Sequence, residues 1–125
     1  MRLGLHAKPK GFSFEVKGKI VQSRFSTGWS QGGFKFQQLR NDRYDAVFCL
    51  GITPQKAYAW VIPKSAIFDQ TGFLLKKPGL TTQHKGKRGS DTAWITIDLT
   101  ALPAWMSACG GTVSEALDIL AALVG

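Results

Sequence analysis

The sequence has few acidic residues, and this scarcity limits the functions that the chain can support. Its 125 residues include 16 lysines and arginines but only 8 aspartates and glutamates, so the formal net charge is +8. A catalytic carboxylate pair of the glycosidase type therefore finds few candidates. The excess of cations favours a polyanionic partner, nucleic acid first and an anionic membrane surface second. A basic globular protein is the plain alternative.

Cysteine and long apolar runs are also scarce. The two cysteines, Cys49 and Cys109, belong to no CxxC or Cys/His cluster, so we expect neither a disulfide framework nor a structural zinc site. No run approaches the ~18 apolar residues that a membrane span needs, and the N-terminus lacks the apolar region of a signal peptide. These absences predict a cytoplasmic single domain over residues 1–125 that does not engage a membrane.

The motifs of several common enzyme classes are missing as well. Gly86-Lys87-Arg88 lacks the hydroxyl residue of a phosphate-binding P-loop and follows no predicted strand. No dinucleotide fingerprint and no nucleophile elbow of a serine hydrolase occurs. His84 lies in a polar loop, where a catalytic role is a minor alternative.

The stretch Phe12–Val21 is what the chain does offer for chemistry. It holds Glu15, the only acid of the first forty residues. Read as one strand, it alternates in polarity, because residues two apart project from the same face. The polar face consists of Ser13, Glu15, Lys17 and Lys19. A carboxylate can bind Mg²⁺ and a neighbouring lysine can assist a water near a phosphate, so this face suits phosphodiester hydrolysis.

The middle of the chain predicts a helix followed by a hairpin. Phe36 and Leu39 are three residues apart, which favours a helix over Phe34–Asn41. Tyr44–Ile52 is a nearly continuous apolar run, typical of a strand buried on both faces. Ala57–Ile62 is a second strand, and the short link between the two predicts an antiparallel pair. One helical turn is expected over Pro63–Phe68.

The C-terminal part predicts a strand and two helices. Thr92–Leu99 alternates as a strand does. Thr100 is expected to cap a short helix that has Pro103 in its first turn. Gly110-Gly111 is expected to end this helix. Thr112 and Glu115 form a capping box. The helix that it opens carries an apolar stripe made of Val113, Ala116, Leu117, Leu120, Leu123 and Val124.

Two loops are candidates for contact with nucleic acid. Residues 22–33 mix Gly and Ser with Phe25 and Trp29, although both aromatics could equally cover the edge of the core. Residues 69–90 form the most basic loop, which could follow a phosphate backbone or be a solvated excursion. The predicted phosphate contacts are Lys19, Arg24, Arg40, Lys85, Lys87 and Arg88.

The order of these segments resembles the PD-(D/E)xK nuclease superfamily. Phe14-Glu15-Val16-Lys17 looks like its motif strand, and Phe34–Arg40 looks like the helix after it. Tyr44–Ile52 and Ala59–Pro63 look like the strands that follow. The resemblance covers roughly the first half of the chain. It implies an α/β, restriction-endonuclease-like central mixed sheet with flanking helices, in which Glu15 binds Mg²⁺ or Mn²⁺ and Lys17 assists the water. Gln38 matches, more loosely, a polar position near the site.

One part of that family's pattern is absent. Members carry another acid before the motif strand, often preceded by a helix, and residues 1–14 contain no acid. Three explanations stay open: a chain that lacks this helix and first acid, an acid supplied by a partner chain or a homodimer, or a site that only binds DNA. Asp45 could replace the acid only if it lay beside Glu15.

The sequence thus predicts a metal-dependent DNA nuclease or a nuclease-derived DNA-binding domain. The alternatives are a non-catalytic nucleic-acid-binding or assembly module with the same fold, and a basic protein whose partner is another protein.

Overall fold

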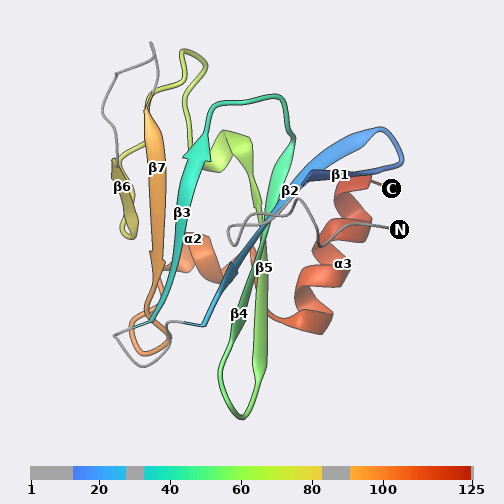
Figure 1. Cartoon of the computed structure of the whole chain (residues 1–125), viewed down its shortest axis with the longest axis vertical. Coiled ribbons are helices and arrows are strands. Elements are labelled where there is room, and N and C mark those ends of the chain that lie inside the picture. The colour runs from blue at the N-terminus through green and yellow to red at the C-terminus, as the bar shows by residue number, and fades with distance from the viewer. Residues whose placement is uncertain (1–12, 28–32, 83–90, 125) are drawn as a thin grey trace.

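The computed structural model describes residues 13–27, 33–82 and 91–124, and within them the chain forms two β-sheets. The larger sheet has the strand order β1-β2-β4-β5-β8 and the smaller one the order β3-β7-β6. Strands β2 and β4 pair in parallel, whereas every other strand pair among the described residues is antiparallel. The predicted mixed sheet of an α/β protein is therefore confirmed at this coarse level (Figure 1).

The eight strands have the following bounds: β1 Ser13–Val16, β2 Lys19–Ser26, β3 Phe34–Arg40, β4 Ala46–Ile52, β5 Ala57–Pro63, β6 Leu80–Thr82, β7 Thr92–Ile97 and β8 Gly110–Thr112. The helices are the 3-10 turn η2 at Lys64–Ala66, the short α2 at Ala104–Ser107 and the longer α3 at Val113–Val124. No helix in the described part of the chain is long and apolar enough to cross a membrane.

The predicted hairpin between the apolar strands is confirmed. Strands β4 and β5 pair from Ile52 with Ala57 to Ala46 with Pro63. Thr53 closes the connection, because its Oγ1 accepts hydrogen bonds from the backbone N–H groups of Gln55 and Lys56. The 3-10 turn η2 follows Pro63, where one helical turn was predicted.

The helix predicted over Phe34–Asn41 is wrong, because this segment is strand β3. Phe34 and Phe36 alternate inward as in any strand, and both are buried. A β-bulge then shifts the register between Phe36 and Leu39. One inserted residue turns the spacing of two into a spacing of three, so the apolar pattern imitates a helix.

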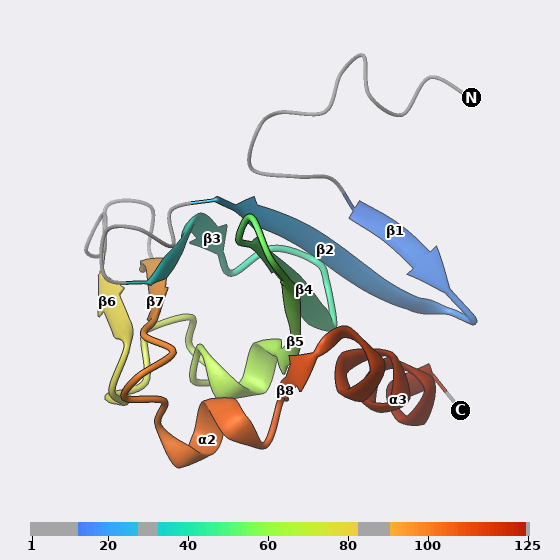
Figure 2. The same cartoon turned by 90° about the horizontal axis from the view of Figure 1, so that it is seen from below.

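The main core lies between the two sheets. Phe34 and Phe36 of β3 meet Trp60 of β5 and Met106 of α2 in one buried cluster. Figure 2 shows the two sheets facing each other across this core, with α2 and η2 closing one side. Gly51 is required for this approach, since a Cβ there would lie 2.6 Å from the ring of Phe34.

Helix α3 covers the opposite face of the larger sheet, where Ala116 packs with Ala59 and Val61 (Figure 2). The predicted capping box is confirmed: the Glu115 N–H donates to Thr112 Oγ1, and the Thr112 N–H donates to Glu115 Oε1. The predicted stripe is wrong at Leu117, which is 51% exposed. Ile119 packs against the sheet instead.

Two details before α3 also differ from expectation. Pro103, not Thr100, is the N-cap residue of α2. The Thr100 side chain and N–H donate to Asp98 in a turn of their own. Gly110-Gly111 ends the helical segment, as predicted. The two glycines themselves belong to strand β8, where they pair with Trp60 and Ala59.

Candidate functional site

Glu15 and Lys17 do not share a strand face. Lys17 and Gly18 form a two-residue turn between β1 and β2, with φ values of 50° and 84°. Positive φ at both central residues is the pattern of a type I′ hairpin turn, which glycine accommodates without strain. The single strand predicted over Phe12–Val21 is therefore wrong: it is a hairpin, in which Glu15 pairs with Ile20 and Lys17 belongs to the turn.

Asp45 lies in the same row of the sheet as Glu15, but with one strand between them. The Asp45 N–H donates to the Ile20 carbonyl at 2.7 Å, and the Ile20 N–H donates to Asp45 Oδ2 at 2.8 Å. Two strand spacings separate the backbones of Glu15 and Asp45, about 9.5 Å. Asp45 is therefore not directly beside Glu15, and one of its carboxylate oxygens already holds the start of β2.

The described residues do not fit a magnesium site. They contain no group of three or more His, Cys, Asp and Glu side chains that could hold a metal ion. Mg²⁺ requires near-octahedral oxygen ligands at about 2.1 Å. Glu15 is an exposed carboxylate with no second acid beside it in its row except the engaged Asp45. Within residues 13–27, 33–82 and 91–124, no metal centre is assembled around Glu15.

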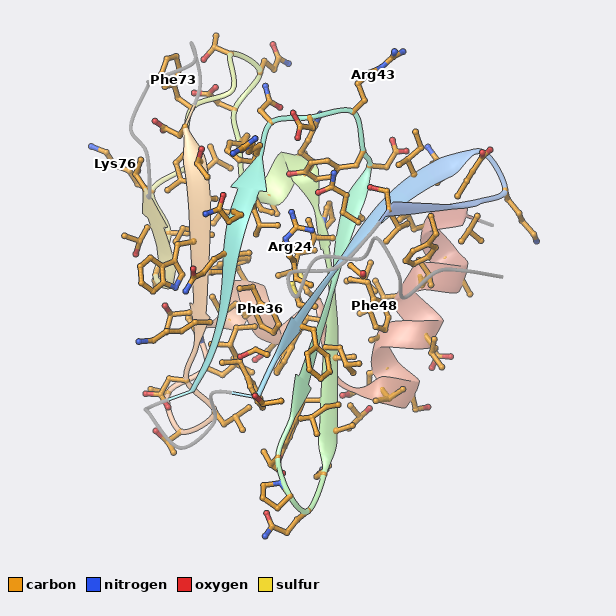
Figure 3. All side chains as sticks on the ribbon, in the orientation of Figure 1. Arg24, Phe36, Arg43, Phe48, Phe73 and Lys76 are labelled. Carbon is orange, nitrogen blue, oxygen red and sulfur yellow. The ribbon has the colours of Figure 1, made fainter. Side chains whose placement is uncertain are left out.

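Arg24 is buried, although the sequence suggested a phosphate contact. It is 9% exposed, and it pairs with Cys49 on the side of β2 that faces the core between the sheets (Figure 3). Burial lowers the pKa of its guanidinium and raises the pKa of the Cys49 thiol. The guanidinium cannot act as an ordinary surface phosphate contact, because its N–H groups are committed to partners inside the protein.

Those partners connect two strands of different sheets. Arg24 Nε donates to the Gln37 carbonyl at 3.1 Å, and Nη2 donates to the Gln38 carbonyl at 3.0 Å. Nη1 donates to the Ser23 carbonyl, and Nη2 also donates to Gln22 Oε1. Four of the five guanidinium N–H groups are thereby used. The sequence predicted Arg24 and Gln38 as site residues, and the structure brings these two together.

Gln38 occupies a strained position in this arrangement. It lies in the β3 bulge, not on a helix, and its φ is 62°. Such a backbone conformation is uncommon outside glycine and persists where the surroundings enforce it. The enforcing group is Arg24, which binds the carbonyls of both bulge residues. Bulges that re-aim side chains recur next to functional sites.

One end of the molecule collects basic residues from several segments. Strands β2 and β4 are parallel, so the β1–β2 turn lies beside the loop before β4, and β5 ends at the same level. We call this end the basic edge; it comprises Lys17, Lys19, Arg40, Arg43 and Lys64. Glu15, Asp42 and Asp45 accompany it. Figure 3 shows Arg43 projecting away from the fold at this end.

The members of the basic edge differ in how free they are to bind a ligand. Lys17, Lys19 and Arg43 are exposed, whereas Arg40 and Lys64 are partly buried. Lys64 Nζ lies over the Tyr44 ring and donates to the Asp42 carbonyl, which fixes the loop before β4. The three exposed cations are therefore the ones positioned for an external anion.

The structure does not test the other predicted phosphate contacts. Lys85, Lys87 and Arg88 fall outside the described residues. Sequence reasoning missed Arg43, whose only signal was its place in the turn Asn41-Asp42-Arg43. It also missed Lys35, whose ammonium lies 5.7 Å from the ring centroid of Trp94. The sequence does not predict that pairing, because its apolar spacing favours a helix over Phe34–Asn41 and does not encode the register of β3 with β7.

Comparison with known proteins adds no assignment. No protein-family model matches the chain, and neither a curated protein nor a solved structure matches it. The fold and the site thus define a basic mixed α/β protein with two sheets.

Proposed function

We propose that this chain is a DNA-binding domain, related to the restriction-endonuclease-like nucleases, that does not hydrolyse DNA by itself. The parallel pairing of β2 with β4, flanked by two hairpins, is compatible with the mixed sheet of that fold. The single observation that carries the binding function is the basic edge. Exposed cations from the β1–β2 turn and from the loop before β4 lie at one end of a rigid sheet, where they can contact successive phosphates.

The geometry of the hairpin supports the non-catalytic part of the proposal. Lys17 lies in a turn, and Glu15 has no free acid beside it among the described residues. A carboxylate and a lysine on different parts of a hairpin do not converge on one water and one phosphate. Binding to phosphates needs only the cations, so it survives the loss of this constellation.

Measuring the salt dependence of DNA binding tests the proposal. A labelled duplex should bind in fluorescence anisotropy, and log K should fall linearly with log salt because counterions are released. The double variant Lys19→Ala/Arg43→Ala should weaken binding and reduce the slope by about two. Lys56→Ala/Lys76→Ala removes the same charge away from the basic edge and is the matched control. Equal slopes in both double variants would contradict the assignment of this edge, and no binding at low salt would refute the function.

A magnesium-dependent nuclease is the second candidate, with the missing acid supplied by a second copy of this chain in a homodimer. The observation in its favour is that β1, which carries Glu15, is the terminal strand of the larger sheet among the described residues, so Glu15 lies at the sheet's edge rather than in its middle. Plasmid cleavage with Mg²⁺ or Mn²⁺ separates the candidates. We expect no cleavage by the chain alone. Metal-dependent nicking that disappears in both Glu15→Ala and Lys17→Ala would replace our proposal with the nuclease.

A further inference from the structure

The outer face of the three-stranded sheet is polar, and neither α2 nor α3, the α-helices of the described residues, packs on it. Phe36 and Ile95 pair on the inner face and are buried, so their neighbours along β3 and β7 point outward. Helix α2 packs into the core through Met106, and α3 packs on the other sheet (Figure 2). The outer face carries Lys35, Gln37, Thr81, Trp94 and Thr96.

Trp94 and Lys35 form the centre of this face, which we call the Trp94 face. Trp94 is partly buried, and the Lys35 ammonium stands over its ring. The Trp94 Nε1 group is covered and has no hydrogen-bond partner. Among the described residues, the Lys35 ammonium also has no hydrogen-bond acceptor, and it contacts the Trp94 ring. The exposed Lys35 ammonium could therefore gain hydrogen bonds from a ligand that offers acceptors, whereas the covered Trp94 Nε1 could not, so the Trp94 ring is available for stacking only.

A second pair of the same kind shows the difference. Lys77 lies 4.9 Å from the ring centroid of Trp105, but its Nζ donates to the Ala66 carbonyl. Trp105 Nε1 donates to the Pro78 carbonyl. That pair has its polar groups satisfied and serves the fold. In the Lys35–Trp94 pair these polar groups have no hydrogen-bond partner among the described residues. The pair lies on the outer face of the sheet.

The strained bulge of β3 lies directly beside Trp94. The register places Phe36 opposite Ile95 and Leu39 opposite Ala93, so Gln37 and Gln38 together oppose Trp94. Gln37 is exposed, and its carbonyl is held by Arg24. A buried arginine thus maintains an unfavourable backbone conformation that sets a carboxamide next to an aromatic ring. Strain of this sort, retained by specific bonds, motivates a functional interpretation.

We propose that the Trp94 face binds single-stranded nucleic acid. A base stacks on the exposed part of the Trp94 ring, Lys35 moves from the ring to the neighbouring phosphate, and the Gln37 carboxamide bonds to an edge of the base. Aromatic side chains on a sheet with cations beside them suit unpaired bases, because a duplex keeps its base faces stacked inside. This inference rests on the proposed nucleic-acid binding and names the form of the ligand.

Anisotropy titrations at low salt with labelled oligo(dT), oligo(rU) and a duplex of equal length test the inference. Trp94→Ala should weaken binding of both single strands by about 5- to 150-fold and leave duplex binding unchanged. Trp94→Phe should retain single-strand binding within a few-fold, since a ring remains. Phe73→Ala, which removes an aromatic that is 42% exposed and lies outside this face, is the matched control and should change nothing.

The outcomes separate this inference from the function on which it rests. No binding of any oligonucleotide refutes the proposed function. Single-strand binding that Trp94→Ala leaves intact refutes the Trp94 face and spares the basic edge. If Trp94→Ala unfolds, as circular dichroism would show, Lys35→Ala decides: it should lower the salt slope on oligo(dT) by about one, and an unchanged slope overturns the inference. A preference for oligo(rU) over oligo(dT) would make RNA the natural strand.

Discussion

Arg24 connects two sheets that share no strand pairing. It stands on β2 of the larger sheet and binds the carbonyls of Gln37 and Gln38 on β3 of the smaller one. Ser26 adds a second link, because its Oγ accepts a hydrogen bond from the Lys35 N–H. A cation that sequence analysis assigned to the surface thus organises the junction between the sheets.

Replacing Arg24 by methionine should destabilise the fold. The substitution keeps an apolar stem of similar length but leaves the bulge carbonyls without donors, which costs about 1–3 kcal/mol. Urea denaturation followed by circular dichroism measures the loss. Arg43→Met is the control, because Arg43 is exposed and its replacement should change stability by less than about 0.5 kcal/mol. Equal stabilities of the two variants would show that the junction does not depend on these hydrogen bonds.

Among the elements, the β1–β2 hairpin contains a turn residue, Lys17, whose backbone conformation can be tested separately from any chemical role. Lys17 adopts a positive φ in an exposed turn, a conformation that an L-residue with a long side chain disfavours. Lys17→Asn would create Asn-Gly, the preferred pair for a type I′ turn. The variant should therefore be more stable than the natural chain.

The expected gain for Lys17→Asn is about 0.5–1 kcal/mol, measured by urea denaturation. Lys19→Asn is the comparison: it makes the same change of side chain on a strand, where asparagine is disfavoured, and should lower stability slightly. A loss of stability in Lys17→Asn would argue against the turn and would return Lys17 to a strand face.

The elements also show what could be read from the sequence and what could not. The β4–β5 hairpin and the capping box were predicted correctly, because a continuous apolar run and a Thr-x-x-Glu spacing are local signals. Strand β3 was missed because its bulge changes the apolar period from two to three. The turn at Lys17 was not predicted, because the spacing of Glu15 and Lys17 favours one continuous strand. The Lys17-Gly18 pair, which ends the strand, is the signal that indicates the turn.

For the whole molecule, the pairing of distant strands escaped prediction altogether. Strand β3 pairs with β7 and does not join the larger sheet. This pairing depends on contacts between residues about sixty apart in the chain, which no local pattern encodes. The Trp94 face follows from this pairing, and the basic edge follows from the parallel pairing of β2 with β4. The net charge, in contrast, was available from composition alone and correctly pointed to surface cations.

The charge of the whole chain also sets its response to acid. Hydrogen bonds from the Thr71 and Thr100 side chains lower the pKa of Asp69 and Asp98, and the Thr112 backbone N–H lowers the pKa of Glu115. A carboxyl group with a lower pKa in the folded chain stabilises the fold above its unfolded pKa of about 4. This contribution is lost as the pH falls through the folded pKa. Protonation of all acids also raises the net positive charge and its self-repulsion.

The urea midpoint should therefore be constant from pH 7 to about 5 and should fall steadily between about pH 4 and 2. Glu115→Gln isolates one contributor, because it keeps a side-chain acceptor for the Thr112 N–H but cannot titrate. Its midpoint should start lower at pH 7 and fall less steeply in acid. A midpoint that rises on acidification, or a Glu115→Gln slope equal to that of the natural chain, would mean that these carboxylates do not hold the fold in the way their hydrogen bonds imply.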